Sequence, residues 1–570
     1  MFDYIIVGGG SAGSVLAGRL SDDPAIRVAL IEAGPADRSV LIHCPAGLAV
    51  IAKFELNGWG YNTVPQPGLN GRRGYQPRGK VLGGSSSINA MVYARGHASD
   101  YDGWAAQGNP GWSYADVLPY FKRAEHNERG ADELHGQGGP LNVMDLRSPN
   151  PFLASFIEAG QQAGHAHNTD FNGRKQEGVG AYQVTHKNGE RFSAAKGYLT
   201  PHLQRPNLQV ITNALTTRVV MDTTDAQPRA VGVEYRSNGG RGPMQELRLK
   251  AGGEVVLSAG AFGSPQLLML SGVGPAAHLQ EHGITPVLDL PGVGANLHDH
   301  VDVVIVVNAP KAKDLFGLTP GGLWKAVRGI FEWRRQRSGV LTTNFAEAGG
   351  FIKSSPDEAI PDLQLHFVVG KLVDHGRKSV LGYGYSCHVC LLRPRSRGSL
   401  RLASADPQVA PLIDPAFLQD PEDTARLVRG FKVMRTLLQQ NALTRHGGTE
   451  SATSALAQSD AQIEQFVRNH ADTIYHPVGT CRMGPDGSPG AMHVVDARLR
   501  VHGVAGLRVV DASVMPAVVG GNTNAPVIMM AEKAVDMMLD DRLATFFPKE
   551  QAHDSRTRRH PHRSAQELGV

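Results

Sequence analysis

The sequence is poor in cysteine and in long apolar runs, and each shortage excludes a class of protein. Four cysteines in 570 residues are too few for a disulfide framework. A run of about 18–20 uncharged apolar residues, which a membrane-spanning helix needs, is missing, so we expect no such helix. The first apolar strand starts almost at residue 1, which leaves no room for a secretory signal and predicts a cytoplasmic protein.

Two of the cysteines, Cys387 and Cys390, form a Cys-x-x-Cys pair within the apolar stretch 383–392. This stretch is typical of a strand, and residues three apart on a strand point to opposite faces. A redox or zinc site needs convergent thiols, so we interpret both as buried structural cysteines.

Charge is also sparse and nearly balanced. Charged residues make up 19% of the chain, and 57 basic against 53 acidic residues leave a net charge of +4. Such a balance gives no indication of nucleic-acid binding, which needs a concentrated basic face. A hydrophobic content of 41% fits a globular protein. The length predicts two or more domains.

Glycine, in contrast, is abundant, and its first cluster lies between a predicted strand and helix. The strand 3–7 runs into Gly8-Gly9-Gly10-Ser11-Ala12-Gly13, a helical segment follows, and a second strand at 28–31 ends at Glu32. Gly8 permits the turn, Gly10 admits a pyrophosphate and Gly13 lets helix pack on strand. Glu32 accepts ribose hydroxyls. This Gly-x-Gly-x-x-Gly motif in βαβ context predicts a dinucleotide site, for NAD or FAD.

Three further stretches depart from a simple alternating α/β domain. Residues 78–92 form a second Gly/Ser-rich loop. A strand at about 253–260 precedes a helix that we expect to start at Pro265, capped by Ser264. Another strand at 507–510 ends at Asp511, and a last helix is expected from about 525 to 539.

These stretches carry a resemblance. The segments 79–96 and 260–274, the pattern His476-Pro-Val-Gly-Thr and the later Asn524-Ala-Pro resemble the signatures of the glucose–methanol–choline (GMC) oxidoreductases, FAD enzymes that oxidise alcohols. The likeness runs from Phe2 to about Asp540. It is strongest to the bacterial alcohol dehydrogenases of alkane degradation and to the choline dehydrogenases.

The resemblance implies an α/β plus α+β fold in which a Rossmann-like FAD-binding domain is interleaved with an antiparallel-sheet substrate-binding domain. We expect the FAD-binding domain at 1–300 and 471–545, and the substrate-binding domain at 301–470. Family members that attach FAD covalently do so through a histidine at the position of Ile88, so the FAD here is expected to be non-covalent. The residues expected at the cofactor are Gly8, Gly10, Ser11, Ala12, Gly13, Glu32, Val81, Gly83, Asn89, Met91, Val92, Val219, Ala259, Asp511, Ala512 and Asn522.

The expected catalytic pair is His476 and Asn524. Oxidation of an alcohol removes a hydroxyl proton and a carbon-bound hydride; the flavin takes the hydride and the protein must take the proton. Neutral histidine is a suitable base near pH 7. Asn524 is expected to donate an N–H to the same substrate oxygen. The pair His298 and His300, around Asp299, is interpreted as structural, and no metal is expected.

On the substrate side, Tyr475 and Phe345 are expected near the alcohol, and Glu347 matches the position that holds a quaternary ammonium in choline-oxidising relatives. Choline recognition also needs an aromatic cage. Phe345 and Ala346 replace bulkier aromatic residues there, which favours an apolar primary alcohol, with electrons passing to a quinone or another acceptor. Three alternatives remain open, namely choline dehydrogenase, an oxidase using dioxygen, and a cyanohydrin lyase that retains FAD.

Two segments bear on location. Residues 323–335 predict a basic amphipathic helix with Leu323, Val327 and Ile330 on one stripe. Such a helix lies either on an anionic membrane surface or against the core beside the substrate entrance. The first alternative would put the enzyme peripherally on the inner face of the cytoplasmic membrane. The polar tail 548–570 is expected to be disordered.

Overall fold

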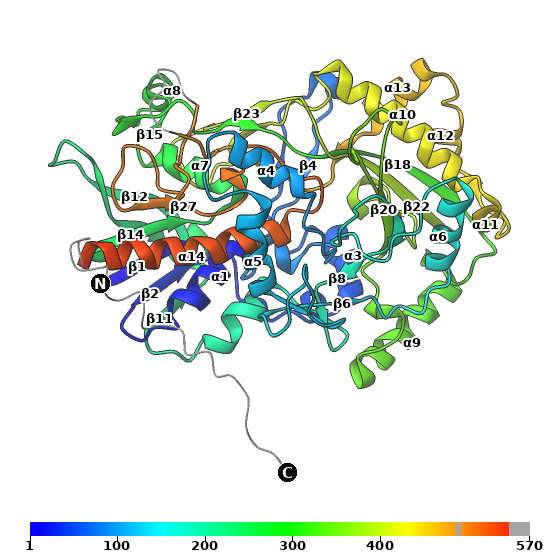
Figure 1. Ribbon diagram of the computed structural model, residues 1–570, viewed down its shortest axis with the longest axis horizontal. Helices are drawn as coiled ribbons and strands as arrows, with labels where there is room; N and C mark the ends of the chain where they lie inside the picture. Colours follow the sequence, from blue (N-terminus) through cyan, green and yellow to red (C-terminus); the bar gives the residue numbers. More distant parts are fainter. Residues whose placement is uncertain (486–491, 547–570) are drawn as a thin grey trace, which may run out of the picture.

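The computed structural model describes residues 1–485 and 492–546; the predicted disordered tail, 548–570, lies outside them. Figure 1 shows two large β-sheets side by side, one carrying β1, β2 and β14 and the other β18, β20 and β22. One sheet is partly parallel and the other antiparallel. The predicted combination of a Rossmann-like α/β unit with an antiparallel-sheet unit is confirmed.

The first sheet has the strand order β11-β2-β1-β14-β13-β12, with β27 also paired to β14. Its β11, β2, β1, β14 and β27 are mutually parallel, and β13 and β12 are antiparallel additions. The strands are β1 Phe2–Val7, β2 Val28–Ile31, β11 Leu208–Ile211, β12 Leu215–Asp222, β13 Arg229–Arg236, β14 Met244–Leu257 and β27 Leu507–Val509.

The crossover from β1 to β2 is helix α1, Ser11–Leu20, which begins directly after Gly10. Gly8 has φ 101°, a left-handed conformation that favours glycine. A Cβ on Gly13 would lie 1.9 Å from the carbonyl oxygen of Gly8, so helix and strand approach at backbone distance. The last helix, α14 Asn524–Phe546, packs along α1 and is longer than the predicted 525–539 (Figure 1).

Helix α7, Gly260–Leu270, follows β14 and corrects the prediction that a helix starts at Pro265. Pro265 lies inside this helix, where its missing N–H leaves the carbonyl of Ala261 without its usual partner. The hydroxyl of Thr480 donates to that carbonyl at 2.6 Å. Ser264, expected as the cap, instead donates its hydroxyl to Asp511 at 2.5 Å.

The second sheet has the order β25-β18-β22-β21-β20-β7, with β19 on β22 and β26 on β18. Helices α6, α10 and α13 pack against it. Because β7 and β26 come from outside 301–470, the expected domain boundaries describe this sheet only in part. The strands are β7 Gly178–Ala181, β18 Val301–Asn308, β19 Gly317–Leu318, β20 Ala346–Ile352, β21 Leu363–Val368, β22 Gly382–Leu391, β25 Thr449–Glu450 and β26 Asp472–Thr473.

Several helices complete the two units. They include α3 Leu48–Lys53, α4 Ala98–Ala106, α5 Tyr114–Ala124, α6 Phe152–Gln162, α9 Pro320–Gln336, α10 Pro421–Leu438, α12 Ala452–Ala455 and α13 Asp460–His470. Among the described residues, the helices are all too short or too polar to cross a bilayer.

Two hydrophobic cores lie on the two sheets, and a small third cluster lies between them. Cys387 belongs to the core of the second sheet, whereas Cys390 belongs to the cluster between the sheets. The two buried thiols therefore diverge, as the strand periodicity predicts.

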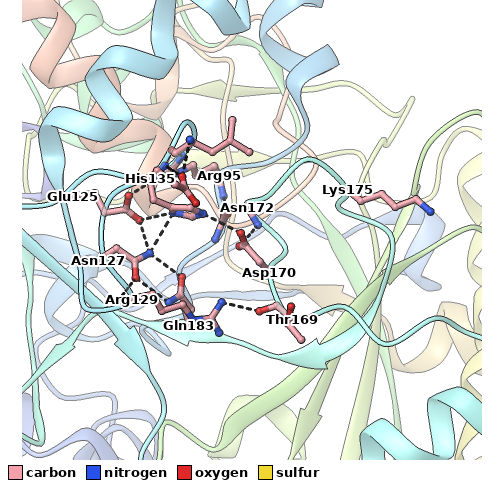
Figure 2. A network of polar contacts seen from close by, with 12 residues as sticks. Arg95, Glu125, Asn127, Arg129, His135, Thr169, Asp170, Asn172, Lys175 and Gln183 are labelled. Carbon is pink, nitrogen blue, oxygen red and sulfur yellow. Dashed lines mark hydrogen bonds and ion pairs between the residues drawn. The ribbon is translucent and has the colours of Figure 1, made fainter.

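A buried network of charges anchors the segment 91–96 (Figure 2). Arg95 forms an ion pair with Glu125 at 2.7 Å, and both side chains are buried. His135 bridges Glu125, at 3.3 Å, and Asp170, at 2.9 Å. Burial alone would lower the pKa of His135, but these two carboxylates raise it to about 9. The network thus holds a charged imidazolium between two carboxylates, and it fixes the end of the second Gly-rich loop.

We expect Gly13→Ala to abolish dinucleotide binding, because the new methyl group would meet the Gly8 carbonyl at 1.9 Å and push α1 off β1. The matched control is Gly103→Ala in helix α4, where a Cβ has open space and alanine is favoured by about 0.5–1 kcal/mol. Bound flavin per chain, read from visible absorbance, should be lost in the first variant and kept in the second. Equal flavin content in both variants would contradict the prediction.

Candidate functional site

A cavity of about 1220 Å³ runs between the two sheets, from the β1–α1 loop to β21 and β22. Sixteen of the expected site residues line it: Gly8, Gly10, Ser11, Ala12, Glu32, Asn89, Met91, Val92, Ala259, Phe345, Tyr475, His476, Asp511, Ala512, Asn522 and Asn524. Gly13, Val81, Gly83, Val219 and Glu347 lie outside its wall.

At one end, Glu32 is held by backbone N–H groups. Gly9 donates to one carboxylate oxygen and Gly34 to the other, each at 2.8 Å. Burial raises the pKa of Glu32 to about 7, although both N–H bonds favour the ionised form. Each oxygen keeps a lone pair for a ribose hydroxyl. The N-terminus of α1, lined by Ser11 and Ala12, offers free N–H groups to phosphates.

The lining of this end fits a dinucleotide. Thr216 Oγ1 and Ser258 Oγ are buried and lack a hydrogen-bond partner among the described residues, and both residues line the cavity. Such orphaned groups are costly unless a ligand satisfies them. Val219, expected at the cofactor, instead donates its N–H to Ser271 Oγ at 2.8 Å. Within β12, the cavity is therefore lined by Leu215 and Thr216 and not by Val219.

The second Gly-rich loop docks on the first. The N–H of Gly83 donates to the carbonyl of Gly9 at 2.7 Å, and a Cβ on Gly84 would lie 2.7 Å from Gly10 Cα. Gly83 and the buried Val81 thus support the loop, while the neighbouring Asn89, Met91 and Val92 line the cavity.

Asp511 accepts four hydrogen bonds in the cavity wall. It accepts from the backbone of Gly260 at 2.9 Å and of Ser513 at 2.8 Å, and from the hydroxyls of Ser264 and Ser513 at 2.5 Å each. Burial raises the pKa of Asp511 against these donors. It therefore ties α7 to β27 and presents Ala259 and Ala512 to the cavity.

At the other end, His476 is 7% exposed. Its backbone N–H donates to Asp299 at 2.8 Å, and its Nδ1 lies 3.0 Å from Nδ1 of His300. Burial lowers the pKa of His476 well below its ordinary value, and the nearby cation Arg78 lowers it further. The imidazole is therefore neutral. His300 and Asp299, interpreted from the sequence as merely structural, position His476.

The hydrogen-bonding neighbour of His476 is Asn522 and not Asn524. Asn522 Nδ2 lies 3.2 Å from His476 Nε2. The side chain of Asn524 instead accepts a hydrogen bond from Ser11 Oγ at 2.8 Å. The two asparagines stand two residues apart at the start of α14, so one faces the base and the other faces the N-terminus of α1.

Of the three residues expected near the substrate, two line the cavity and one does not. Phe345 and Tyr475 line the cavity, both with positive φ, and the hydroxyl of Tyr475 lies 2.8 Å from Nδ1 of His375. Glu347 is buried outside the cavity wall, where Thr343 donates to it at 2.6 Å. Its carboxylate does not face the reaction site as the expectation required.

Two histidines that sequence reasoning missed also line the cavity, His366 on β21 and His388 on β22. They are direct partners in the antiparallel register. Asp302 lies 2.5 Å from Nδ1 of His388. Each histidine has apolar neighbours on both sides in its strand, Leu365 and Phe367 or Cys387 and Val389, which is the signal that could have identified them. In the described part of the chain, groups of three metal-ligating side chains are absent.

Comparison with known proteins assigns the family. One family model described as "GMC oxidoreductase" matches residues 2–302, and a second model with the same description matches residues 394–531. The chain belongs to the GMC oxidoreductase family. The predicted class, FAD-dependent oxidation of alcohols, is confirmed at this level.

Individual relatives cover nearly the whole chain. The chain is 48% identical to an alcohol dehydrogenase [acceptor] of Pseudomonas putida, over 95% of this chain and 96% of the relative. It is 46% identical to the human mitochondrial choline dehydrogenase, over 94% and 89%. Among solved structures, pyridoxine 4-oxidase from Mesorbium loti aligns with a TM-score of 0.82 and 31% identity, covering 94% of this GMC chain and 99% of the other.

We expect FAD affinity to rise with pH between about 6 and 8. Burial raises the pKa of Glu32 to about 7, and only the ionised carboxylate accepts hydrogen bonds at both oxygens. Protonation at lower pH therefore removes an acceptor from the ribose. The Kd of FAD, measured by titrating the apoprotein, tests this.

The variant Glu32→Gln cannot ionise, so its FAD affinity should be pH-independent and lower by roughly 10- to 100-fold, the worth of a hydrogen bond to a charged group. Glu281→Gln, at a carboxylate that is 72% exposed, is the control and should match the parent. A pH-dependent affinity in Glu32→Gln would assign the dependence to another group.

Proposed function

We propose that this GMC oxidoreductase oxidises an apolar primary alcohol to its aldehyde, with His476 as the base that accepts the hydroxyl proton. The observation that carries this is a neutral, buried imidazole whose Nε2 faces an apolar cavity beside an amide donor. FAD, when bound, supplies the acceptor for the hydride that leaves the alcohol carbon.

His476 suits a proton acceptor because it is already deprotonated in the resting enzyme. Burial lowers its pKa, so the lone pair on Nε2 is present before the alcohol arrives. The proton that it takes is the one that leaves the hydroxyl as the carbonyl forms. The apolar surroundings also keep bulk water from competing for that lone pair.

Asn522 takes the orienting role that we expected of Asn524. Its Nδ2 group, 3.2 Å from His476 Nε2, has a second N–H that donates to an alcohol oxygen lying against both groups, and it stabilises negative charge as the hydroxyl proton leaves. Asn524, bonded to Ser11, supports the phosphate-binding N-terminus of α1.

The substrate preference follows from the walls next to His476. Leu315, Phe316, Phe345, Val368 and Leu372 line the cavity, and the last three pack in one cluster with Ile474 and Tyr475, which directly precede His476. The carboxylate of Glu347, which would balance a quaternary ammonium, is buried behind the wall. These contacts favour an aliphatic or aromatic alcohol over choline.

Two finer points complete the proposal. The residue at the position of covalent attachment in relatives is Ile88, which lacks a nucleophile, so we propose non-covalent FAD. We also propose that electrons leave to a quinone or a comparable acceptor, because apolar side chains surround the cavity mouth.

The apolar stripe of α9 faces solvent and not the core. Leu323, Trp324 and Phe331 are 68%, 71% and 64% exposed, and Leu323 lines the cavity mouth together with Leu381, which is 78% exposed. Figure 1 shows α9 at the periphery of the molecule. Lys325, Arg328, Arg334 and Arg335 add positive charge. We propose that this face rests on an anionic membrane and opens the cavity toward it.

The catalytic assignment predicts different results at the three polar residues. Under anaerobic conditions, 1-octanol or benzyl alcohol should bleach the flavin of the parent enzyme. His476→Ala should slow bleaching by about 10²–10⁴-fold, the contribution of a general base. Asn522→Ala should slow it by roughly 10²–10³-fold. Asn524→Ala, the matched control, should keep the rate once FAD is saturating.

Stopped-flow absorbance measures these rates. If Asn524→Ala slowed bleaching and Asn522→Ala did not, the roles would be reversed. If neither these alcohols nor choline bleached the flavin, alcohol oxidation would be wrong and a lyase would be tested instead. Reoxidation by air, compared with a quinone analogue, separates an oxidase from a dehydrogenase.

The membrane proposal is tested by co-sedimentation with vesicles of phosphatidylglycerol and phosphatidylcholine. The double variant Trp324→Glu with Phe331→Glu should bind at least about tenfold more weakly, since each burial contributes about 1.5–3 kcal/mol.

Leu456→Glu, a change at a side chain that is 76% exposed after helix α12, is the control and should bind like the parent. Equal binding of both variants would refute the α9 surface.

A further inference from the structure

A continuous chain of hydrogen bonds runs through the site and ends at a backbone carbonyl on each side. One end is the carbonyl of Leu365 on β21, and the other is the carbonyl of Leu392 after β22. Between them lie, in order, Tyr182, Gln364, Asn522, His476 and His300. Because a carbonyl only accepts hydrogen bonds, each end sets the direction of donation along its half of the chain.

From the Leu365 end, every group has one allowed role. Tyr182 donates its O–H to Leu365 at 2.6 Å, so its oxygen is left to accept. The group that reaches this oxygen, at 3.2 Å, is therefore the amide nitrogen of Gln364. The same nitrogen donates to Asn522 Oδ1 at 3.1 Å. Asn522 must then turn its Nδ2 donor toward His476 Nε2, which has to accept.

From the Leu392 end, the same result follows independently. His300 Nε2 lies 3.0 Å from the carbonyl and must donate to it. A neutral imidazole has one N–H, so His300 Nδ1 accepts, and the partner 3.0 Å away, Nδ1 of His476, must carry a proton. His476 Nε2 is again left without one.

We propose that Gln364 and His300 are positioning residues that lock His476 in the tautomer with its proton on Nδ1 and its lone pair on Nε2, aimed into the cavity. The inference rests on the proposed function only for the chemistry that this lone pair performs. The tautomer itself follows from the hydrogen bonds on the two sides of His476. Neither residue lines the cavity, and each acts through another side chain.

Burial makes the lock effective. Tyr182, Gln364 and His300 are all buried, so water cannot replace a lost partner. Burial also lowers the pKa of His300 to about 3, which keeps it to a single N–H. Gly349 on β20 keeps space for the chain, because a Cβ there would lie 2.5 Å from the Tyr182 hydroxyl and 2.0 Å from the Leu365 carbonyl.

The decisive variant is Gln364→Glu, which keeps the shape and replaces the donor by a carboxylate once the buried acid ionises. Because burial raises the pKa of a carboxyl group, both readouts of this variant are taken at high pH. The introduced carboxylate cannot donate to Asn522 Oδ1, so the Asn522 amide should turn and present oxygen to His476, favouring a proton on Nε2. We expect flavin reduction by alcohol to slow by about 10²-fold or more, as for loss of a general base. As pH falls and the carboxyl group gains a proton, it donates again, so the variant should recover while the parent does not.

Tyr182→Phe removes the anchor and frees the Gln364 amide to turn, so a mixture of tautomers and a smaller loss of rate are expected. Its matched control is Tyr101→Phe, because buried Tyr101 also donates its hydroxyl to a backbone carbonyl, that of Arg95, but lies outside the chain. The control should keep the rate of the parent. Equal losses of rate in both variants would show that the effect is general destabilisation and not a change of tautomer.

A second readout needs no substrate. In holoenzyme with 15N-labelled histidine, the His476 signals, identified by their loss in His476→Gln, report which ring nitrogen carries the proton. We expect Nδ1–H in the parent and Nε2–H in Gln364→Glu. A proton on Nε2 in the parent, or an unchanged tautomer in Gln364→Glu, would overturn the proposal. If no alcohol reduces the flavin, the proposed function fails while this measurement still decides the tautomer.

Discussion

The site depends on backbone segments that approach more closely than any side chain allows. Gly13 brings α1 onto Gly8, and Gly84 brings the second loop onto Gly10, both at distances where a Cβ would collide with backbone atoms. These two contacts form the floor of the cavity and leave its N–H groups facing inward. If either contact were lost, α1 and the loop would separate, and the residues that they carry would no longer converge.

On that floor, the second sheet completes the reaction end of the cavity. β21 and β22 supply His366 and His388, and Gln364 reaches across to Asn522 at the start of α14. The strands come from the middle of the chain and the asparagine from its end. The reacting groups are thus assembled only when the two units meet.

The sequence predicted the fold and the nucleotide end well, because those features depend on local patterns. The glycine spacing between a strand and a helix can be recognised in the sequence itself, and the same holds for the single acidic residue at the end of β2. The reaction end was predicted less well. Asn522 and Asn524 share one turn, and the choice between them depends on Gln364 from another sheet and Ser11 from another helix. Glu347 lies outside the cavity wall, where Thr343 holds its carboxylate, and no local pattern indicates on which side of the wall it lies.

Two further sequence interpretations, those of Pro265 and His300, differ from the structure for the same reason, because the deciding contact comes from a distant part of the chain. Pro265 normally marks a helix start, but Thr480, more than 200 residues away, satisfies the carbonyl that the proline leaves free. His300 was interpreted as structural because its contact with His476 arises only when β18 pairs with β26. Pairings between distant segments leave no periodicity in either segment, so no local pattern could reveal them.

Burial connects the proposed chemistry with the proposed substrate. The apolar walls that would hold an alkyl or aryl group also lower the pKa of His476, and the positive charge of Arg78 lowers it further. A quaternary ammonium would enter the same apolar surroundings near the guanidinium of Arg78, with the carboxylate of Glu347 buried outside the cavity wall. An uncharged alcohol meets no such penalty, and it leaves the base neutral until the moment of proton transfer. One physical property, the burial of His476 among apolar side chains, therefore favours both the base and the class of alcohol that it is proposed to oxidise.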